Sequence, residues 1–283
     1  MLERELETAR RLALDAGKVI LDVYATDFRE EQKLSVDSHY EPVTEADKQA
    51  SRIIVDGLAL EFPNDAILSE EEHDDLDTRL LRNRTWIIDP VDGTAGFVNR
   101  DGDFAVQIGL AEKGDAILGV VYMPLHGVLM YGVNGQGAYA AVNGDEQRLH
   151  VSEKTDFREM GLATSRHHPS NRMGRIISDF GFTSMIRRGS VGLKVGLIAE
   201  RRCDMYIHPG MRTKIWDTCA PQVVLEEAGG RMTDLFGSRI RYDVIDVQNH
   251  NGIVATNGVV HDRAIARLRP LLKEFGRVPH GVP

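Results

Sequence analysis

Cysteine is scarce in this sequence, with only Cys203 and Cys219 among 283 residues. Two cysteines cannot build the disulfide framework of a small secreted domain, so we expect a reducing, cytoplasmic location. Long hydrophobic runs are also missing, because no segment approaches the roughly 18 consecutive apolar residues of a membrane span. The first residues, Met1 to Glu5, are too charged for a secretory signal. We therefore expect neither a membrane partner nor export.

Positive charge is in deficit, with 34 lysines and arginines against 43 acidic residues and a net charge of -9. A protein that binds a nucleic-acid polymer needs a basic face, so this balance argues against that class. It still allows a small phosphorylated substrate, because bound cations can reverse the local sign of the potential. Repeats and low-complexity linkers are absent too, so we expect the parts of the chain to pack closely as a monomer or a homodimer.

Residues 1–151 have the pattern of an α+β half. Apolar residues at a spacing of three and four predict one helix over 2–24 and another after Thr44, and the polar segment 25–41 between them is expected to be irregular. Alternating or continuous apolar runs predict strands at 65–69, 86–88, 104–110, 116–123, 128–133 and 137–142. Asn143-Gly144 is a hairpin signal, so we expect a largely antiparallel sheet.

Residues 152–283 alternate between the two kinds of element. Strands are predicted at 161–165, 203–207, 231–234 and 252–256, and helices at 170–180, 191–201, 218–228 and 260–275. This alternation is typical of an α/β half. The fold class that follows is a layered α/β sandwich built from two halves.

The segment Asp89-Pro90-Val91-Asp92-Gly93-Thr94 carries the strongest functional signal. Two carboxylates stand three residues apart, directly after an apolar run that predicts a buried strand. Such closely spaced carboxylates repel, and Mg²⁺ relieves the repulsion with oxygen ligands. Gly93 lets the backbone approach a ligand, and Thr94 offers a hydroxyl group. The other interpretation is an ordinary Pro-Asp-Gly turn.

Other acids stand at the ends of predicted elements, and each has a plain structural explanation as well. Glu70 lies in a run of acids that water could solvate, and Asp217 could cap the helix that follows it. Asp47 follows Thr44 by three residues, as in a capping box, and Asp92 could cap a short helix after Gly93. These explanations do not account for the recurrence of acids after apolar runs, which favours a shared metal site.

The same segments resemble the inositol monophosphatase superfamily of Mg²⁺-dependent, typically lithium-sensitive phosphatases. The similar motifs are Glu41-Pro42-Val43-Thr44-Glu45-Ala46-Asp47, Leu68-Ser69-Glu70-Glu71, Asp89-Pro90-Val91-Asp92-Gly93-Thr94, Trp216-Asp217-Thr218-Cys219-Ala220-Pro221 and Glu227-Ala228-Gly229-Gly230. They occur in order across nearly the whole chain. The resemblance implies the αβαβα architecture shared with fructose-1,6-bisphosphatases.

The resemblance also implies roles for individual residues. The metal ligands would be Glu70, Asp89, Asp92, Asp217 and the carbonyl group of Val91, which together would hold two or three Mg²⁺ ions. Thr94 and Asp47 would act together on the attacking water. The segment 36–41 departs from the shorter approach that is common in the family, which leaves its role open.

Within the superfamily, softer signals are similar to the 3'(2'),5'-bisphosphate nucleotidases of the CysQ type. They are residues 93–104, Ser165-Arg166-His167-His168, Gly189-Ser190-Val191-Gly192-Leu193-Lys194 and the segment around Asp217. The substrate-binding candidates are Gly93, Thr94, Ser165, His168, Ser190, Lys194 and Asp217. Lys194 could instead lie in solvent, as a lone lysine on a helix usually does, and His168 could belong to a surface loop.

The predicted function is the hydrolysis of adenosine 3',5'-bisphosphate to AMP, which would clear a by-product of sulfate assimilation. The alternatives are an inositol monophosphatase or a fructose-1,6-bisphosphatase of the same superfamily. A third possibility, from another class, is a non-catalytic module that binds phosphate metabolites. Cys219 is expected to be a packed small residue, because no activating basic partner stands near it in the sequence.

Overall fold

The computed structural model describes residues 2–34, 40–166 and 171–281. Its α-helices are α1 (Glu3–Tyr24), α2 (Glu45–Glu61), α3 (Leu76–Leu81), α4 (Thr94–Val98), α5 (Asn171–Phe180), α6 (Val191–Ala199), α7 (Cys219–Glu227) and α8 (His261–Glu274). Its strands are β1 (Glu30–Leu34), β2 (Tyr40–Thr44), β3 (Ala66–Ser69), β4 (Arg84–Asp92), β5 (Ala105–Glu112), β6 (Asp115–Met123), β7 (Val128–Val133), β8 (Gly137–Val142), β9 (Asp145–Arg148), β10 (Gly161–Ser165), β11 (Ser184–Arg188), β12 (Met205–His208), β13 (Arg231–Thr233) and β14 (Ile253–Thr256).

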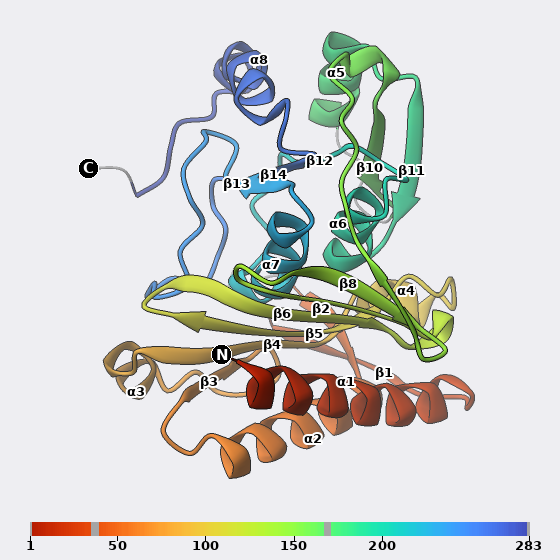
Figure 1. Ribbon diagram of the computed structural model, residues 1–283, viewed down its shortest axis with the longest axis vertical. Coiled ribbons are helices and arrows are strands. Elements are labelled where there is room, and N and C mark those ends of the chain that lie inside the picture. Colours follow the sequence, from red (N-terminus) through yellow and green to blue (C-terminus); the bar gives the residue numbers. More distant parts are fainter. Residues whose placement is uncertain (1, 35–39, 167–170, 282–283) are drawn as a thin grey trace.

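These elements stack in five alternating layers (Figure 1). Helices α1 and α2 lie side by side on the outer face of a seven-stranded sheet with the order β3-β4-β5-β6-β7-β8-β9. Helices α6 and α7 lie between this sheet and a five-stranded sheet with the order β11-β10-β12-β14-β13, and α5 and α8 form the last layer. The layered α/β fold expected from the sequence is confirmed.

The largely antiparallel first sheet expected from the sequence is confirmed, and β3 and β4 form its parallel pair. Asn143 and Gly144 join β8 to β9 with φ angles of 52° and 93°, the left-handed conformation of the predicted hairpin turn. In the second sheet β10 runs parallel to β11 and β12, whereas β14 is antiparallel to both of its neighbours. The first sheet is built from residues 66–148 and the second from residues 161–256.

Helix α7 approaches the first sheet closely because glycines line its contact with three neighbouring strands. Gly109 pairs with Gly119, and Gly119 pairs in turn with Gly132. A Cβ atom on Gly109 would lie 2.6 Å from Cys219 Sγ, and one on Gly119 would lie 2.2 Å from the Ala220 carbonyl oxygen. Any larger residue would push the helix away. Cys219 is fully buried in this contact, so its interpretation as a packed small residue is confirmed.

Several elements were not expected from the sequence, and β2 is one of them. The segment 25–41, predicted to be irregular, contains strand β1, which pairs with β2 in a two-stranded antiparallel sheet. The short helix α3 and the strand β11 at the edge of the second sheet were also missed. None of the helices within the described ranges is long and apolar enough to cross a membrane.

A buried histidine links α8 to the second sheet. His261 is completely buried, and its ring lies between the hydroxyl groups of Thr233 and Thr256. Thr233 Oγ1 donates to the Asp234 carbonyl oxygen, so it accepts a hydrogen bond from His261 Nε2 at 2.9 Å. Nδ1 is then the acceptor for Thr256 Oγ1 at 3.0 Å. The neutral ring satisfies both neighbours, and a second proton would break this arrangement.

We expect this histidine to reduce stability at acid pH. Burial lowers the pKa of His261 from 6.5 to about 4. Because the unfolded chain binds a proton that the folded ring refuses, the free energy of unfolding should fall from about pH 6.5 to pH 4 by up to ~3 kcal/mol. Urea unfolding of the wild type and His261→Gln over this pH range measures the effect, and the variant should show a shallower fall. The assignment would be contradicted if stability fell equally with pH in the wild type and the variant. It would also be contradicted if the NMR signal of the His261 imidazole titrated near pH 6.5.

Candidate active site

The two acids of the 89–94 segment share one side of the chain because β4 ends in a bulge. In a regular strand, residues three apart point to opposite faces. Here Asp89 pairs with Gln107 whereas Asp92 pairs with Ala105, so β4 contains one residue more than β5 over this stretch. Such a bulge redirects side chains, and both carboxylates line the same cavity. The prediction that these acids emerge at the end of a buried strand is confirmed.

The Asp92 carboxylate is hydrogen-bonded to residues of α6 and its N-terminus, which are distant in the sequence. Its Oδ2 accepts a hydrogen bond from the Gly192 amide at 2.8 Å and others from the side chains of Gln107 and Ser190, and Oδ1 accepts from the Val191 amide at 3.2 Å. The carboxylate therefore caps α6, about 100 residues away in the sequence. The expected alternative, a cap on the helix after Gly93, is wrong, because Gly93 itself is the N-cap of α4.

Asp217 reaches the same place from the second half of the chain. It ends a short 3₁₀ helix, Ile215–Asp217, and its Oδ2 accepts a hydrogen bond from the Lys214 amide at 2.5 Å. The N-cap position of α7 belongs to Thr218, so the predicted alternative role of Asp217 as that cap is wrong. One carboxylate oxygen each of Asp89, Asp92 and Asp217 lies within 4.8 Å of the other two.

Glu70 lines the cavity together with these three acids. It follows β3, which is the parallel neighbour of β4, so the two strands end at the same edge. Its side chain is only 16% exposed, so the alternative of an acid solvated by water is wrong. Lys33 of β1 contacts it, with 2.9 Å between Lys33 Nζ and Glu70 Oε1, and also contacts Glu71.

The grouped carboxylates repel one another in the absence of added cations. Burial and the neighbouring acids raise the pKa of Asp89 and of Asp217 well above the ordinary value. Burial also raises the pKa of Asp92, although hydrogen bonds from Ser190 and Gly192 oppose the shift. A group of buried carboxylates with raised pKa values is an unfavourable arrangement that a divalent cation would relieve.

Asp47 and Thr94 are in contact beside these acids. Asp47 Oδ2 accepts hydrogen bonds from the Thr44 amide and hydroxyl at 2.7 and 2.6 Å, so the predicted capping box of α2 is present. The other oxygen, Oδ1, lies 3.2 Å from Thr94 Oγ1. Burial raises the pKa of Asp47 to about 6. Capping and the contact with Thr94 therefore coexist in one side chain, because each uses a different oxygen.

A buried basic side chain lines the same cavity as the acids. Lys194, on α6, is only 2% exposed, so the alternative of a lysine in solvent is wrong. Its Nζ donates to the Gly189 carbonyl oxygen at 3.0 Å and lies 5.0 Å from the centre of the Tyr206 ring. Burial lowers the pKa of Lys194 to about 8, although Asp92 and Asp217 counteract the shift. This position suits a cation that pairs with an incoming anion.

The other predicted substrate-binding residues differ in whether they line the cavity. Gly93 and Ser165 line the cavity. Ser190 is completely buried at the N-terminus of α6, where its hydroxyl donates to Asp92 and accepts from the Leu193 amide at 3.1 Å. His168 and residues 36–39 of the segment 36–41 lie outside the described residues.

Sequence reasoning missed several residues of this cavity, which has a volume of about 250 Å³. They come from β12 and the segment just before Asp217, and they are Tyr206, His208, Arg212, Thr213 and Lys214. The two basic residues so close to Trp216-Asp217 were a signal that could have found them. The Tyr206 hydroxyl and Thr213 Oγ1 are buried and have no hydrogen-bond partner within the described part of the chain, so a ligand could bind them.

A further buried acid, Asp103, holds the segment 89–94 against the second sheet. Asp103 is 1% exposed, and its Oδ2 lies 2.6 Å from Arg166 Nε and accepts from the Gly189 amide at 2.9 Å. A Cβ atom on Gly93, whose φ is 95°, would lie 2.4 Å from the Asp103 carbonyl oxygen. Gly93 is thus required both for its left-handed conformation and for this close approach.

The donor set fits hard divalent cations. Glu70, Asp89, Asp92 and Asp217 offer only oxygen atoms, which Mg²⁺ prefers. The carbonyl oxygen of Val91, between two of these acids, accepts a hydrogen bond from Thr94 and is the only non-carboxylate ligand that was predicted. Burial, and then the neighbouring acids, raises the pKa of Asp89 and of Asp217, and a bound cation would favour their ionised forms.

Comparison with known proteins identifies the family. The sequence profile of the inositol monophosphatase family matches residues 1–273. The chain belongs to this family. It is 33% identical to the 3'(2'),5'-bisphosphate nucleotidase CysQ of Salmonella typhimurium over 237 residues, which cover 84% of this chain and 93% of the relative. The resemblance seen in the sequence motifs is therefore confirmed.

Two further relatives have similar coverage. The fructose-1,6-bisphosphatase/inositol-1-monophosphatase of Thermotoga maritima is 31% identical over 83% of this chain and 85% of its own. The crystal structure of CysQ from Bacteroides thetaiotaomicron has a TM-score of 0.76 and 27% identity, covering 90% of this chain and 98% of the other. Membership of this family makes the chain a metal-dependent phosphatase, and it leaves the substrate to be argued from the site.

Proposed function

We propose that this inositol monophosphatase family member is a Mg²⁺-dependent 3'(2'),5'-bisphosphate nucleotidase that converts adenosine 3',5'-bisphosphate to AMP and phosphate. The observation that carries the proposal is a cavity lined by both acids and a buried lysine. The acids are Glu70, Asp89, Asp92 and Asp217, and the lysine is Lys194. A substrate with two phosphate groups can use both, one phosphate binding through divalent cations and the other through the lysine. The similarity to enzymes named CysQ supports the same choice.

Two or three Mg²⁺ ions would be held by these four acids and the Val91 carbonyl oxygen. When bound, Mg²⁺ supplies the positive charge that neutralises the phosphoryl oxygens and holds water in line for attack. The amide groups of Gly93 and Thr94, at the start of α4, are available to phosphate oxygens.

The proton of the attacking water would leave through Thr94 and Asp47. Thr94 Oγ1 lies 3.2 Å from both Asp47 Oδ1 and the Val91 carbonyl oxygen, and its single hydrogen can be donated to only one of them at a time. When the Val91 carbonyl is engaged elsewhere, the hydroxyl donates to Asp47 and its lone pairs can accept from water. With its pKa raised to about 6, Asp47 is mostly ionised at neutral pH and still basic enough to accept a proton.

The experiment that tests the proposal is a hydrolysis panel with phosphate release as the readout, with and without Mg²⁺. Adenosine 3',5'-bisphosphate, inositol 1-phosphate and fructose 1,6-bisphosphate are compared by kcat/KM. We expect the nucleotide to be the best substrate and all release to require a divalent cation. Hydrolysis of inositol phosphate with none of the nucleotide would overturn the choice of substrate while leaving the phosphatase assignment intact.

The second candidate is an inositol monophosphatase or fructose-1,6-bisphosphatase, which the similarity to the Thermotoga maritima enzyme favours. The non-catalytic binding module is a weaker alternative, because a protein that only binds phosphate does not need a pair such as Thr94 and Asp47 to activate water. Such a module would bind the nucleotide in the presence of Mg²⁺ and release no phosphate.

Lys194→Gln is expected to raise KM for adenosine 3',5'-bisphosphate by about tenfold, because a charge-assisted hydrogen bond to phosphate is lost. The smaller, uncharged amide would not replace it. For adenosine 3'-phosphate, which has no second phosphate, KM should change much less. Steady-state kinetics on the two nucleotides give the ratio of the effects. An equal loss on both substrates would show that Lys194 does not recognise the second phosphate.

A further inference from the structure

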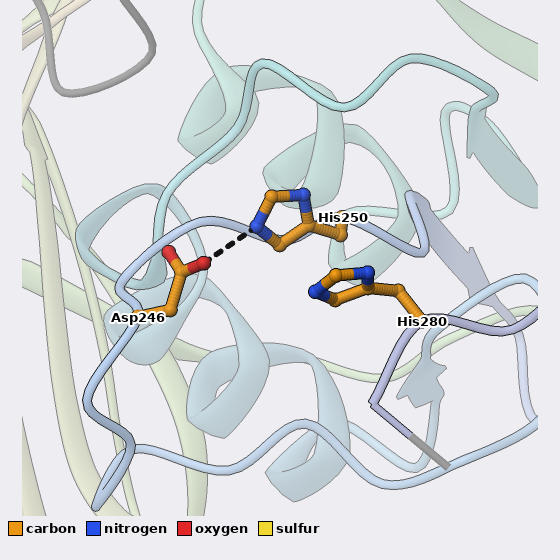
Figure 2. Close-up of side chains that lie close together, drawn as sticks. All are labelled: Asp246, His250 and His280. Atoms are coloured by element: carbon orange, nitrogen blue, oxygen red, sulfur yellow. Dashed lines mark hydrogen bonds and ion pairs between the residues drawn. The ribbon is translucent and has the colours of Figure 1, made fainter.

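A second group of potential metal ligands lies outside the active site. Asp246 and His250 belong to the irregular segment between β13 and β14, and His280 follows α8 near the end of the chain (Figure 2). One donor atom of each residue lies within 4.8 Å of those of the other two. His250 Nε2 is 2.7 Å from Asp246 Oδ2, and the two imidazole rings have their centres 4.2 Å apart. The three side chains face a common space (Figure 2).

Hydrogen bonds to the backbone hold both histidines in place. Arg277 donates to the carbonyl oxygens of Pro209 and His250, at 2.8 and 2.6 Å. The His280 amide donates to Asn251 Oδ1 at 2.7 Å, and Asn251 Nδ2 donates back to the His280 carbonyl oxygen at 3.2 Å. The C-terminal segment is therefore fixed against the 246–251 segment by contacts that do not use either imidazole ring.

The carboxylate of Asp246 is also oriented. Its Oδ1 accepts a hydrogen bond from the Gln248 amide at 3.0 Å, which leaves Oδ2 directed at His250. Such support of a ligand by a hydrogen bond to its other atom is common in protein metal sites. The side chain of Asp246 is 60% exposed and that of His250 is 26% exposed, so an ion could enter from solvent and keep a water ligand.

We propose that Asp246, His250 and His280 form a second metal site, which binds a transition-metal ion such as Zn²⁺ or Co²⁺ and fastens the C-terminal segment to the 246–251 segment. Two imidazole nitrogens and one carboxylate oxygen suit these borderline ions, with water as the fourth tetrahedral ligand. Mg²⁺ prefers oxygen donors, so it should bind the acids of the active site, whereas the site with two histidines should select the transition-metal ion. The proposal is independent of the identity of the phosphorylated substrate.

Hydrogen bonds connect this site to the segment that precedes Asp217 in the candidate active site. The Ile215 amide donates to the Val247 carbonyl oxygen at 2.8 Å, and the Asn249 amide donates to the Thr213 carbonyl oxygen at 2.8 Å. Asn249 Nδ2 also donates to the Lys214 carbonyl oxygen at 2.7 Å. A metal ion that fixes residues 246–250 would stabilise the segment that carries Asp217. We therefore expect metal binding to raise the melting temperature of the protein.

The test uses the full chain, stripped of metal and then saturated with Mg²⁺, and titrates it with Co²⁺. Co²⁺ bound to nitrogen ligands in a tetrahedral site gives intense ligand-field absorption, and Zn²⁺ should then displace it. We expect one such Co²⁺ per chain in the wild type. His280→Asn and His250→Asn should each weaken binding at least about tenfold, which corresponds to about 1.4 kcal/mol. His126→Asn is the matched control, because His126 is an exposed histidine of the 3₁₀ helix Pro124–His126.

Each outcome decides the proposal. Loss of the absorption and of the metal-dependent rise in melting temperature in both site variants, with neither lost in His126→Asn, supports it. Phosphate release by the variants in Mg²⁺ shows that they are folded. Equal Co²⁺ binding by all four proteins would place the ion at the active-site acids and overturn the proposal. Absence of Co²⁺ binding by the Mg²⁺-saturated wild type would overturn it too, and Asp246 and His250 would then be only a hydrogen-bonded surface pair.

Discussion

Asp217→Asn is expected to lower the rate of phosphate release by at least about a thousandfold, which corresponds to about 4 kcal/mol of transition-state stabilisation. Asparagine has the same shape and can still accept the hydrogen bond from the Lys214 amide, so the 3₁₀ helix that carries residue 217 should remain. What disappears is one negative charge among three carboxylates whose oxygens lie within 4.8 Å of one another. Steady-state kinetics over a range of Mg²⁺ concentrations measure the loss.

The same substitution should stabilise the metal-free protein. Without cations, the buried carboxylates of Asp89, Asp92 and Asp217 repel one another, and burial together with the neighbouring acids raises the pKa of Asp89 and of Asp217 well above the ordinary value. Removing one charge relieves the repulsion, and each 1 kcal/mol gained would raise the melting temperature by about 2–4 °C. Mg²⁺ should then raise the melting temperature less than in the wild type. Asp22→Asn, at an exposed position of α1, is the control. Near-normal turnover of Asp217→Asn at saturating Mg²⁺ would remove Asp217 from the ligand set.

The acids of the site could be predicted because each follows an apolar run. The hydrophobic pattern predicts where such a run, and the element it forms, ends. The pattern does not reveal which ends meet. Asp89 and Asp92 face one cavity only because β4 bulges against β5, and a bulge leaves no mark on hydrophobic periodicity. Likewise, Asp92 was expected to cap the helix nearest in sequence, whereas its carboxylate binds the N-terminus of α6. Contacts over such sequence distances depend on tertiary packing.

Exposure explains the elements that were missed. Strand β1 is charged and mostly exposed, so its residues lack the apolar alternation that predicts a strand, and only pairing with β2 shows it. The edge strand β11 is mostly exposed as well. In contrast, the helices α1 and α8 each bury one apolar stripe and were predicted within one residue of both ends, and the predicted start of α2 after Thr44 is confirmed. Lys194 was hard to place for a related reason, because burial of a lysine depends on the carboxylates that surround it.

Thr94→Val is expected to lower kcat by a factor of about 10²–10⁴, the range of a lost proton-transfer step. Valine keeps the size and branching of threonine, so α4 should still begin at this residue and the acids should stay in place. The hydroxyl that links Asp47 to the cavity is removed. Because the proposed metal ligands are unchanged, the Mg²⁺ concentration for half-maximal activity and the substrate KM should change much less than kcat.

Thr94→Ser separates a lost hydroxyl from a disturbed helix. Serine retains the oxygen that lies 3.2 Å from Asp47 Oδ1, so most of the activity should return, whereas a purely structural role of the threonine methyl group would impair Thr94→Ser and spare Thr94→Val, which keeps that methyl group. The pH profile gives a second readout. Asp47, with a pKa raised to about 6, must lose its proton before it can accept another, so wild-type kcat should fall as the pH drops through about 6. In Thr94→Val the residual activity should no longer follow this group, and an unchanged acidic limb would mean that Asp47 acts without Thr94.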